Sequence, residues 1–314
     1  MEDTFHTSPT RRQSRHRIPI WEGLIAWLLV LQLLWPGSPV ATGWVHLLVL
    51  LAPLVVVPLG LQLSGQWSRS GPLMRWLYFP AVLLLSLSYC VPTMPILAWA
   101  ALPWFVWTTS AAVRAIRQYY RMADGHRKLS DFSTLCSFLY LPVGAAWALA
   151  DRLGLQPLGF DATIVVLTAA HFHYAGFVLP LIAGYLLRTS QQFFHRWLGW
   201  GIITGIPLVA LGIVISHFGG PVWLESLFAL FLAFSGMGLS FWQLGMSLQQ
   251  AAIHQIPAMA GSILLAAGMI LAVLYASRFF IDMPYLTIPW MYALHGTANA
   301  GACLLLLWRP HPTV

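Results

Sequence analysis

Two histidines lie two residues apart in an apolar stretch, AAHFHYAGFVLPLIAGYLL, residues 169 to 187. A neutral imidazole can take up or release a proton near neutral pH, and an ionisable side chain inside a membrane usually marks a functional site. On a regular helix His171 and His173 point about 200° apart, so both can reach one small site only if the helix is distorted. Pro180 removes the amide that would bond the carbonyl of Gly176, which predicts a kink just beyond the pair.

A second polar group lies near the C-terminus, in the segment MYALHGTANAGA. His295 and Asn299 are four residues apart on one helix face, where the amide could orient a substrate oxygen beside the imidazole. Glu225, in GPVWLES, adds a carboxyl that an apolar setting would keep protonated, as a general acid requires. Tyr174, three residues after His171, offers a hydroxyl donor. These groups would support acid-base catalysis, or they would carry the coupling protons of a transporter.

The composition of the whole chain is that of a membrane protein. Of 314 residues, 59% are hydrophobic and 8% are charged, and long apolar runs recur along the sequence. We expect an all-α, polytopic transmembrane bundle of about ten helices. The predicted spans are residues 19–35, 41–63, 72–90, 94–113, 132–151, 161–187, 197–216, 221–247, 257–277 and 288–308. The third and fourth runs could instead form a re-entrant hairpin.

The positions of the basic residues predict the orientation. With a cytoplasmic N-terminus, fourteen of the sixteen Lys and Arg residues fall inside, and only Arg152 and Arg278 fall outside. We therefore place both termini in the cytoplasm, with a basic tail over residues 1–18, one membrane domain over residues 19–308 and a short tail over residues 309–314. The net charge of +7 follows from this topology. It indicates contact with membrane lipids and no nucleic-acid partner.

Under this topology the polar side chains of the membrane domain gather in the outer leaflet. Asp161 and Glu225 lie near the outer ends of their spans. At 1.5 Å of rise per residue, deeper groups lie about 9 to 20 Å below the outer surface. From shallow to deep, these are His46, His295, Asn299, and then His171 with His173. Because lipid-facing placement is unfavourable, we expect one pocket that opens to the periplasmic side.

The leading hypothesis is a membrane enzyme that isomerises or cyclises a small lipophilic metabolite without a metal or other cofactor. The expected roles are Glu225 as general acid, His171 or His173 as base, His295 and Asn299 at the reacting oxygen, Asp161 at the pocket mouth, and Tyr174 and His46 in substrate binding. No protein partner is indicated. A proton-coupled transporter is the alternative, although we detect no internal repeat of the kind that transporters often contain. For a single histidine such as His46 or His217, a neutral ring bonded to a backbone carbonyl is the ordinary alternative.

A third hypothesis is a metal or haem oxidoreductase, in which His171, His173, His46 and His295 would be the ligands. The run AHFHY is also found in the haem-copper oxidase catalytic subunit, where adjacent histidines on one helix bind haems on its two sides. The chain has neither the oxidase run HPEVY nor consecutive histidines. Its three cysteines, Cys90, Cys136 and Cys303, have neither metal nor disulfide spacing.

A longer resemblance covers about residues 144 to 301. The run GAAWALADRLGLQPLGFDATIVVLTAAHFHYAGFVLPLIAG, followed by GPVWLE and LHGTANA, resembles the YndJ-like family of multi-pass bacterial membrane proteins. HFHYAGF and HGxxNA are its specific motifs. The resemblance implies a protein of the bacterial cytoplasmic (inner) membrane with a shared His, Glu and Asn site, and it implies no particular reaction.

Overall fold

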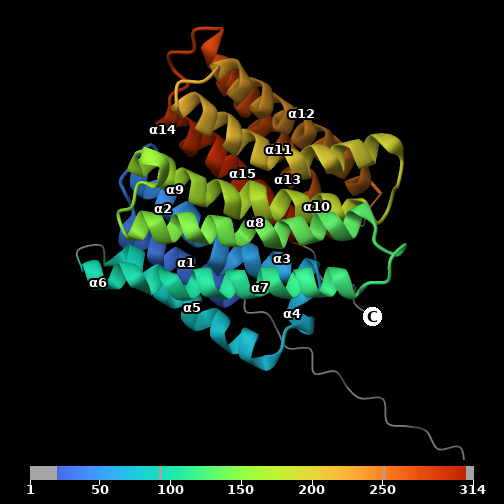
Figure 1. Ribbon diagram of the computed structural model, residues 1–314, viewed down its shortest axis with the longest axis horizontal. Coiled ribbons are helices and arrows are strands. Elements are labelled where there is room, and N and C mark those ends of the chain that lie inside the picture. Colours follow the sequence, from blue (N-terminus) through green and yellow to red (C-terminus); the bar gives the residue numbers. More distant parts are fainter. Residues whose placement is uncertain (1–19, 92–93, 250–251, 309–314) are drawn as a thin grey trace, which may run out of the picture.

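The computed structural model describes residues 20–91, 94–249 and 252–308, and these form an all-helical bundle (Figure 1). When segments that continue without a break are counted together, the described residues form eleven helices and one separate three-residue 3-10 turn. Eight of them are long and apolar enough to cross a membrane. The chain is therefore a multi-pass membrane protein.

The eight candidate spans include several helices that are built from shorter pieces. In chain order they are Thr42–Leu63 (α2, Thr42–Leu51; η1, Ala52–Val56; α3, Val57–Leu63), Pro72–Cys90 (α5), Pro95–Arg121 (α6, Pro95–Ala98; η2, Trp99–Ala101; α7, Leu102–Arg121), Leu129–Arg152 (α8), Ala162–Leu186 (α9, Ala162–His171; η4, Phe172–Gly176; α10, Phe177–Leu186), Phe193–His217 (α11), Val222–Ser247 (α12) and Ile253–Phe279 (α13, Ala252–Ala276; η5, Ser277–Phe279). The remaining elements are α1 (Ile20–Leu34), α4 (Gln66–Arg69), η3 (Pro157–Gly159), α14 (Ile288–Met291), η6 (Tyr292–Gly296) and α15 (Thr297–Leu307).

The helical class predicted from the sequence is confirmed, and eight of the roughly ten predicted spans are helices long and apolar enough to cross a membrane among the described residues. The first predicted span is α1, which has only 15 residues. The last one is the continuous helix α14–η6–α15, whose polar His295 and Asn299 interrupt its apolar sequence. Residues 72–113 belong to two separate long helices and not to a re-entrant hairpin. The two predicted tails, 1–18 and 309–314, lie outside the described residues.

Three of the composite helices contain a π-helical turn, namely η1, η4 and η6. A π turn inserts one extra residue into a helix and redirects the side chains on either side of it. These helices pack on one another, because α2 contacts α9 and η6, and α15 contacts both η1 and η4. The distortion expected near Gly176 is therefore present as the π turn η4.

Hydroxyls of α8 donate to backbone carbonyls of neighbouring helices, one of which is freed by a proline. Pro207 cannot donate to the carbonyl of Ile203 in α11, and the Tyr140 hydroxyl donates to that oxygen at 2.7 Å. The Ser133 hydroxyl donates to the carbonyl of Pro180 at 2.7 Å. In hydrocarbon an unpaired carbonyl is unfavourable, so these bonds hold α8 against α10 and α11.

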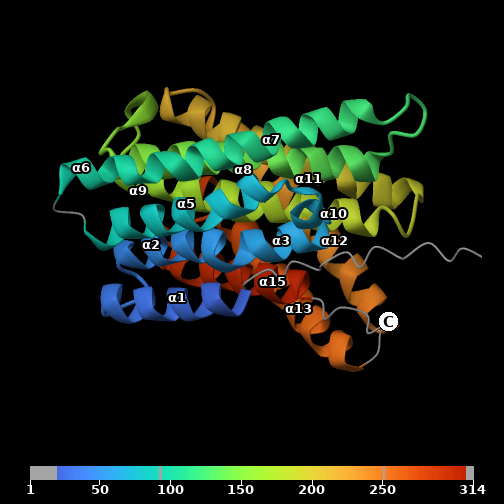
Figure 2. The ribbon, with the colours of Figure 1, turned by 90° about the horizontal axis from the view of Figure 1, so that it is seen from below.

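Basic residues are concentrated at one end of the bundle. The loops joining α7 to α8 and α10 to α11 lie side by side there (Figure 1). A small polar crevice at this end brings Arg69, Asp131 and Arg188 together. We call it the arginine-rich end; the opposite end carries Arg152 and Arg278, at the ends of α8 and α13. In the view of Figure 2, α1 lies along the edge of the bundle, and α13 is tilted relative to the central helices.

The contact between α8 and α10 leaves no room for a side chain at Gly184. A Cβ there would lie 2.8 Å from the Ser130 carbonyl oxygen, which is backbone and cannot move aside. We predict that Gly184→Ala lowers the free energy of unfolding by about 1–3 kcal/mol, the usual range for overpacking. The measurement is unfolding by SDS in mixed micelles, followed by tryptophan fluorescence.

The matched control is Gly245→Ala in α12, where a Cβ meets nothing within 4 Å. This change should leave stability unchanged or raise it by up to about 1 kcal/mol, because alanine favours a helix over glycine. Equal effects of the two substitutions on stability would contradict the close contact between α8 and α10 at Gly184.

Candidate functional site

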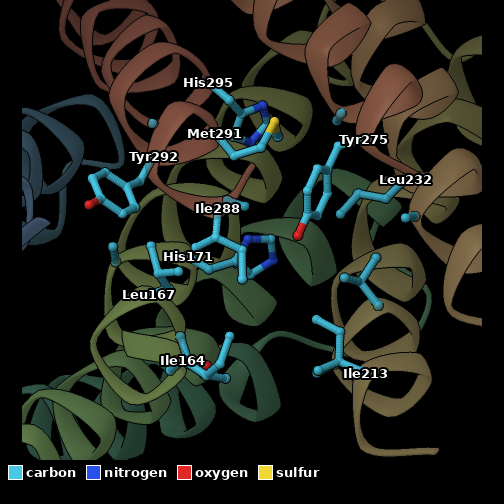
Figure 3. Close-up of a pocket in the computed structure, with 18 of the residues that line it drawn as sticks. Ile164, Leu167, His171, Ile213, Leu232, Tyr275, Ile288, Met291, Tyr292 and His295 are labelled. Atoms are coloured by element: carbon cyan, nitrogen blue, oxygen red, sulfur yellow. Dashed lines mark hydrogen bonds between the residues drawn. The ribbon is translucent and has the colours of Figure 1, made fainter. Parts of the chain in front are cut away.

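A cavity of about 840 Å³ lies between α9 and η4 on one side and α11, α12, α13 and the α14–η6–α15 helix on the other (Figure 3). Most of its wall is aliphatic or aromatic. The apolar lining residues labelled in Figure 3 are Ile164, Leu167, Ile213, Leu232, Ile288 and Met291. Of the eight site residues predicted from the sequence, six line the cavity, namely Asp161, His171, Tyr174, Glu225, His295 and Asn299. The other two, His46 and His173, are absent from its lining.

His171 is the histidine of the HFHY motif that faces the cavity. It ends α9 at the junction with η4, and its ring projects into the open space (Figure 3). Its Nε2 atom is buried and has no hydrogen-bond partner among the described residues. Tyr275, from α13, points its hydroxyl toward this ring (Figure 3). A ligand in the cavity would therefore meet an imidazole that is free to exchange a proton.

His173 points away from the cavity, into the contact with α7 and α8. Its side chain is fully buried; Nδ1 donates to the Ala169 carbonyl at 2.8 Å, and Nε2 accepts from the Trp104 indole at 3.1 Å. A carbonyl can only accept and an indole N–H can only donate, so these partners fix a neutral tautomer. Gly144 makes the space, because a Cβ there would lie 2.7 Å from Nδ1. His173 is thus part of the scaffold, and the expectation that either histidine could serve as the base narrows to His171.

His295 and Asn299 form a pair on the opposite wall. Nδ1 of His295 donates to the Gly268 carbonyl at 2.8 Å, and Nε2 accepts from the Asn299 amide at 3.0 Å. The Oδ1 atom of Asn299 lies against Gly268 and is buried without a hydrogen-bond partner among the described residues. The ring is therefore held neutral in one orientation, in a position to direct a ligand and not to exchange protons freely.

Glu225 lies at the rim of the cavity in an ion pair with Arg278. The Ser216 hydroxyl donates to its second carboxylate oxygen. The Arg278 guanidinium lies 4.0 Å from the ring centres of both Tyr275 and Phe279. Both carboxyl oxygens of Glu225 therefore have a hydrogen-bond partner. This pairing differs from the isolated carboxyl that we expected of a general acid, because the sequence did not show that Arg278 would lie beside it.

Three further lining residues are already engaged in the scaffold. The Asp161 carboxylate accepts from the Ile164 amide at 3.0 Å and caps the N-terminus of α9. The Tyr174 hydroxyl donates to the Leu48 carbonyl at 2.8 Å, which ties η4 to α2. Nε2 of His217 bonds the Leu158 carbonyl at 3.1 Å. A ring bonded to a backbone carbonyl is the arrangement we gave as the alternative to a functional role for this histidine.

His46 belongs to a separate polar group at the same end of the bundle. Its Nε2 lies 3.9 Å from the Asp151 carboxylate, and its ring centre lies 5.2 Å from that of Tyr89. The Arg152 guanidinium lies 4.7 Å from the centre of the Tyr89 ring. These residues come from α2, α5 and α8, so the structure does not bring His46 together with His171 and His295.

The geometry offers no ready metal site in the part of the chain that is described. No group of three or more His, Cys, Asp or Glu side chains is arranged there to hold an ion. The four histidines proposed as possible ligands are divided between the cavity (His171, His295), the α7–α8 contact (His173) and the Asp151 group (His46).

Tyr275 and Arg278 were missed by the sequence analysis. Arg278 was counted as a topological charge, and Tyr275 lies near the end of a predicted span, where an aromatic residue is expected at the interface. One available signal was their spacing of three residues, which places both side chains on one flank of the helix.

Comparisons with known proteins give one family. A family model described as YndJ-like protein matches residues 47–302, which extends well before the segment identified by its motifs. The "Uncharacterized membrane protein YndJ" of Bacillus subtilis (strain 168) is 36% identical over 118 residues, which are 37% of this chain and 21% of that relative. The aligned segment thus spans about a fifth of the relative's length. No solved structure was found that matches the chain.

The two histidines should differ in their effect on stability. We predict that His173→Phe lowers the free energy of unfolding by about 2–4 kcal/mol. The substitution removes the hydrogen-bond partners of the Trp104 indole N–H and of the Ala169 carbonyl in the core. His171→Phe should change it by less than about 1 kcal/mol, because that ring faces open space and has no partner to lose. Unfolding in SDS measures both. A larger loss for His171→Phe than for His173→Phe would contradict the assigned orientations.

Proposed function

This chain belongs to the YndJ-like family, and we propose that it is a membrane enzyme that isomerises or cyclises a small lipophilic molecule held in the cavity. The observation that carries the proposal is the free His171 imidazole, buried in a large apolar cavity and faced by the Tyr275 hydroxyl. A concave, mostly apolar cavity with a few convergent polar groups is the usual form of a small-molecule site.

His171 would act as the base and Tyr275 as the acid. His171 removes a proton from one atom of the ligand, and Tyr275 supplies a proton to another, so the product has the same composition as the substrate. The proton that His171 gains can return to Tyr275 when product leaves, which requires no metal, cofactor or second substrate. Their separate positions on α9 and α13 allow the two transfers to occur on different sides of the ligand.

Of the remaining polar residues, some would orient the ligand and others would support the rim and wall of the cavity. His295 and Asn299 hold a neutral, fixed face toward the ligand, supported by the Gly268 carbonyl. Glu225 and Arg278 organise the rim and take no direct part in proton transfer. Tyr174 and Asp161 maintain the wall by their bonds to Leu48 and Ile164.

The charge distribution supports a location in the bacterial cytoplasmic membrane with the arginine-rich end inside. Nine of the eleven Lys and Arg residues in the described part of the chain flank loops of that end, and two lie at the opposite end. By the positive-inside rule, the cavity would then occupy the outer half of the membrane, where a lipophilic substrate can enter from lipid.

We predict that the purified protein in lipid nanodiscs converts a component of an organic extract, made from cells that lack it, into a product of equal mass. In D₂O the product should gain deuterium where a carbon-bound proton is replaced. His171→Gln and Tyr275→Phe should each slow conversion by about a hundredfold or more, the usual contribution of acid-base catalysis. Liquid chromatography with mass spectrometry measures both quantities.

The matched control is His195→Gln. His195 stacks on Trp242 near the arginine-rich end and bonds Ser190. It is not among the residues that line the cavity, so its replacement should leave conversion unchanged. Conversion at the normal rate by His171→Gln would refute the proposed base. If cells that express the protein instead release a compound unchanged into the medium, the protein is a transporter.

A further inference from the structure

The charges in the cavity wall lie at its rim, and each has a partner. The charged residues that line the cavity are Asp161, Glu225 and Arg278. Asp161 caps α9, while Glu225 and Arg278 neutralise one another. A ligand would therefore meet no free charge, positive or negative, among the described lining residues.

Most of the uncharged polar groups in the wall are also engaged. The hydroxyls of Tyr174 and Tyr292 donate to the backbone carbonyls of Leu48 and Val40. Both ring nitrogens of His295 are occupied. What remains for a ligand is His171 and Tyr275, two neutral groups that can each accept or donate a hydrogen bond, together with the unpaired Oδ1 atom of Asn299, which can only accept.

This pattern limits the polar part of the ligand. A carboxylate or phosphate in an apolar cavity needs a cation or several donors to replace its water, and the wall offers neither in its interior. A hydroxyl or a carbonyl needs only one or two hydrogen bonds, which His171 and Tyr275 can provide. The rest of the ligand must be apolar to match the wall.

Building on the proposed function, we propose that the cavity selects uncharged lipophiles that carry one hydroxyl or carbonyl group, and that Glu225 enforces this selection by neutralising Arg278. Arg278 is the one cation of the described lining, with a side chain 25% exposed at the rim. Without the Glu225 carboxylate, its guanidinium would attract acids in a medium of low dielectric constant. Selectivity would then rest on removal of an attraction for the wrong ligand, as well as on fit to the right one.

The test compares three probes with the same C15 isoprenoid chain: farnesene, farnesol and farnesoic acid. Binding to the full chain in nanodiscs is measured by competition with tritiated farnesol at pH 8, where farnesoic acid is ionised. For the unchanged protein we expect farnesol to bind about two- to tenfold more tightly than farnesene, the yield of about one hydrogen bond. Farnesoic acid should bind at least about tenfold more weakly than farnesol.

The decisive variant is Glu225→Gln, which leaves Arg278 unpaired with little change in shape. It should raise the affinity for farnesoic acid at least about tenfold, because one charge-assisted pair is gained, and should change that for farnesol by less than about threefold. The double variant Glu225→Gln with Arg278→Gln should lose the gain. It also controls for a general loosening of the rim, since both variants remove the same ion pair.

Equal binding of farnesol and farnesoic acid by the unchanged protein would overturn the proposal. So would failure of Glu225→Gln to gain affinity for the acid, or failure of farnesol to bind. The assay requires no turnover, so its result is distinct from that of the deuterium experiment. If the expected selectivity is found but no product gains deuterium, the proposed enzymatic activity is rejected, and the cavity is a binding site for neutral lipophiles.

Discussion

The hydrogen bonds that hold His173 between Trp104 and the Ala169 carbonyl determine the arrangement of the cavity. The Trp104 bond fixes the middle of the α9–η4–α10 helix against α7, and Gly144 leaves room for the ring beside α8, so these contacts set which side of the helix faces the other way. A buried polar ring that lost one of these partners would cost about 1–3 kcal/mol, so the helix has little freedom to rotate. His171 is left on the open side as a consequence. Its availability to a ligand thus depends on how well its neighbour is satisfied.

Hydrogen bonds between helices also explain how this membrane bundle tolerates so many interrupted helices. Prolines and π turns release backbone carbonyls in a medium without water, and hydroxyls from other helices bond them. Tyr140 bonds the Ile203 carbonyl, and Tyr174 bonds that of Leu48. These bonds replace regular helix geometry with fixed contacts between helices. They also allow α9 and η4 to stand apart from α12 and α13, which leaves room for the cavity between them.

The rim shows how one pairing changes the chemistry of a site. A glutamate alone in an apolar wall could act as an acid, whereas Glu225 forms an ion pair with Arg278 and accepts a hydrogen bond from Ser216. We therefore propose Tyr275, whose hydroxyl faces His171, for the acid role. The cavity thus has paired charges at its rim and uncharged polar groups in its interior.

The sequence by itself determined the helical class, most of the spans and the set of polar residues from which the site is drawn. These follow from local properties: the length of apolar runs, the cost of polar groups in hydrocarbon and the periodicity of a helix. Tertiary structure alone decided which histidine faces the cavity, because Trp104 lies 69 residues from His173 in the chain. It alone decided the partner of Glu225, because Arg278 lies 53 residues away. Hydropathy describes how each helix meets the membrane, and it carries no information about which neighbour a buried polar side chain will find.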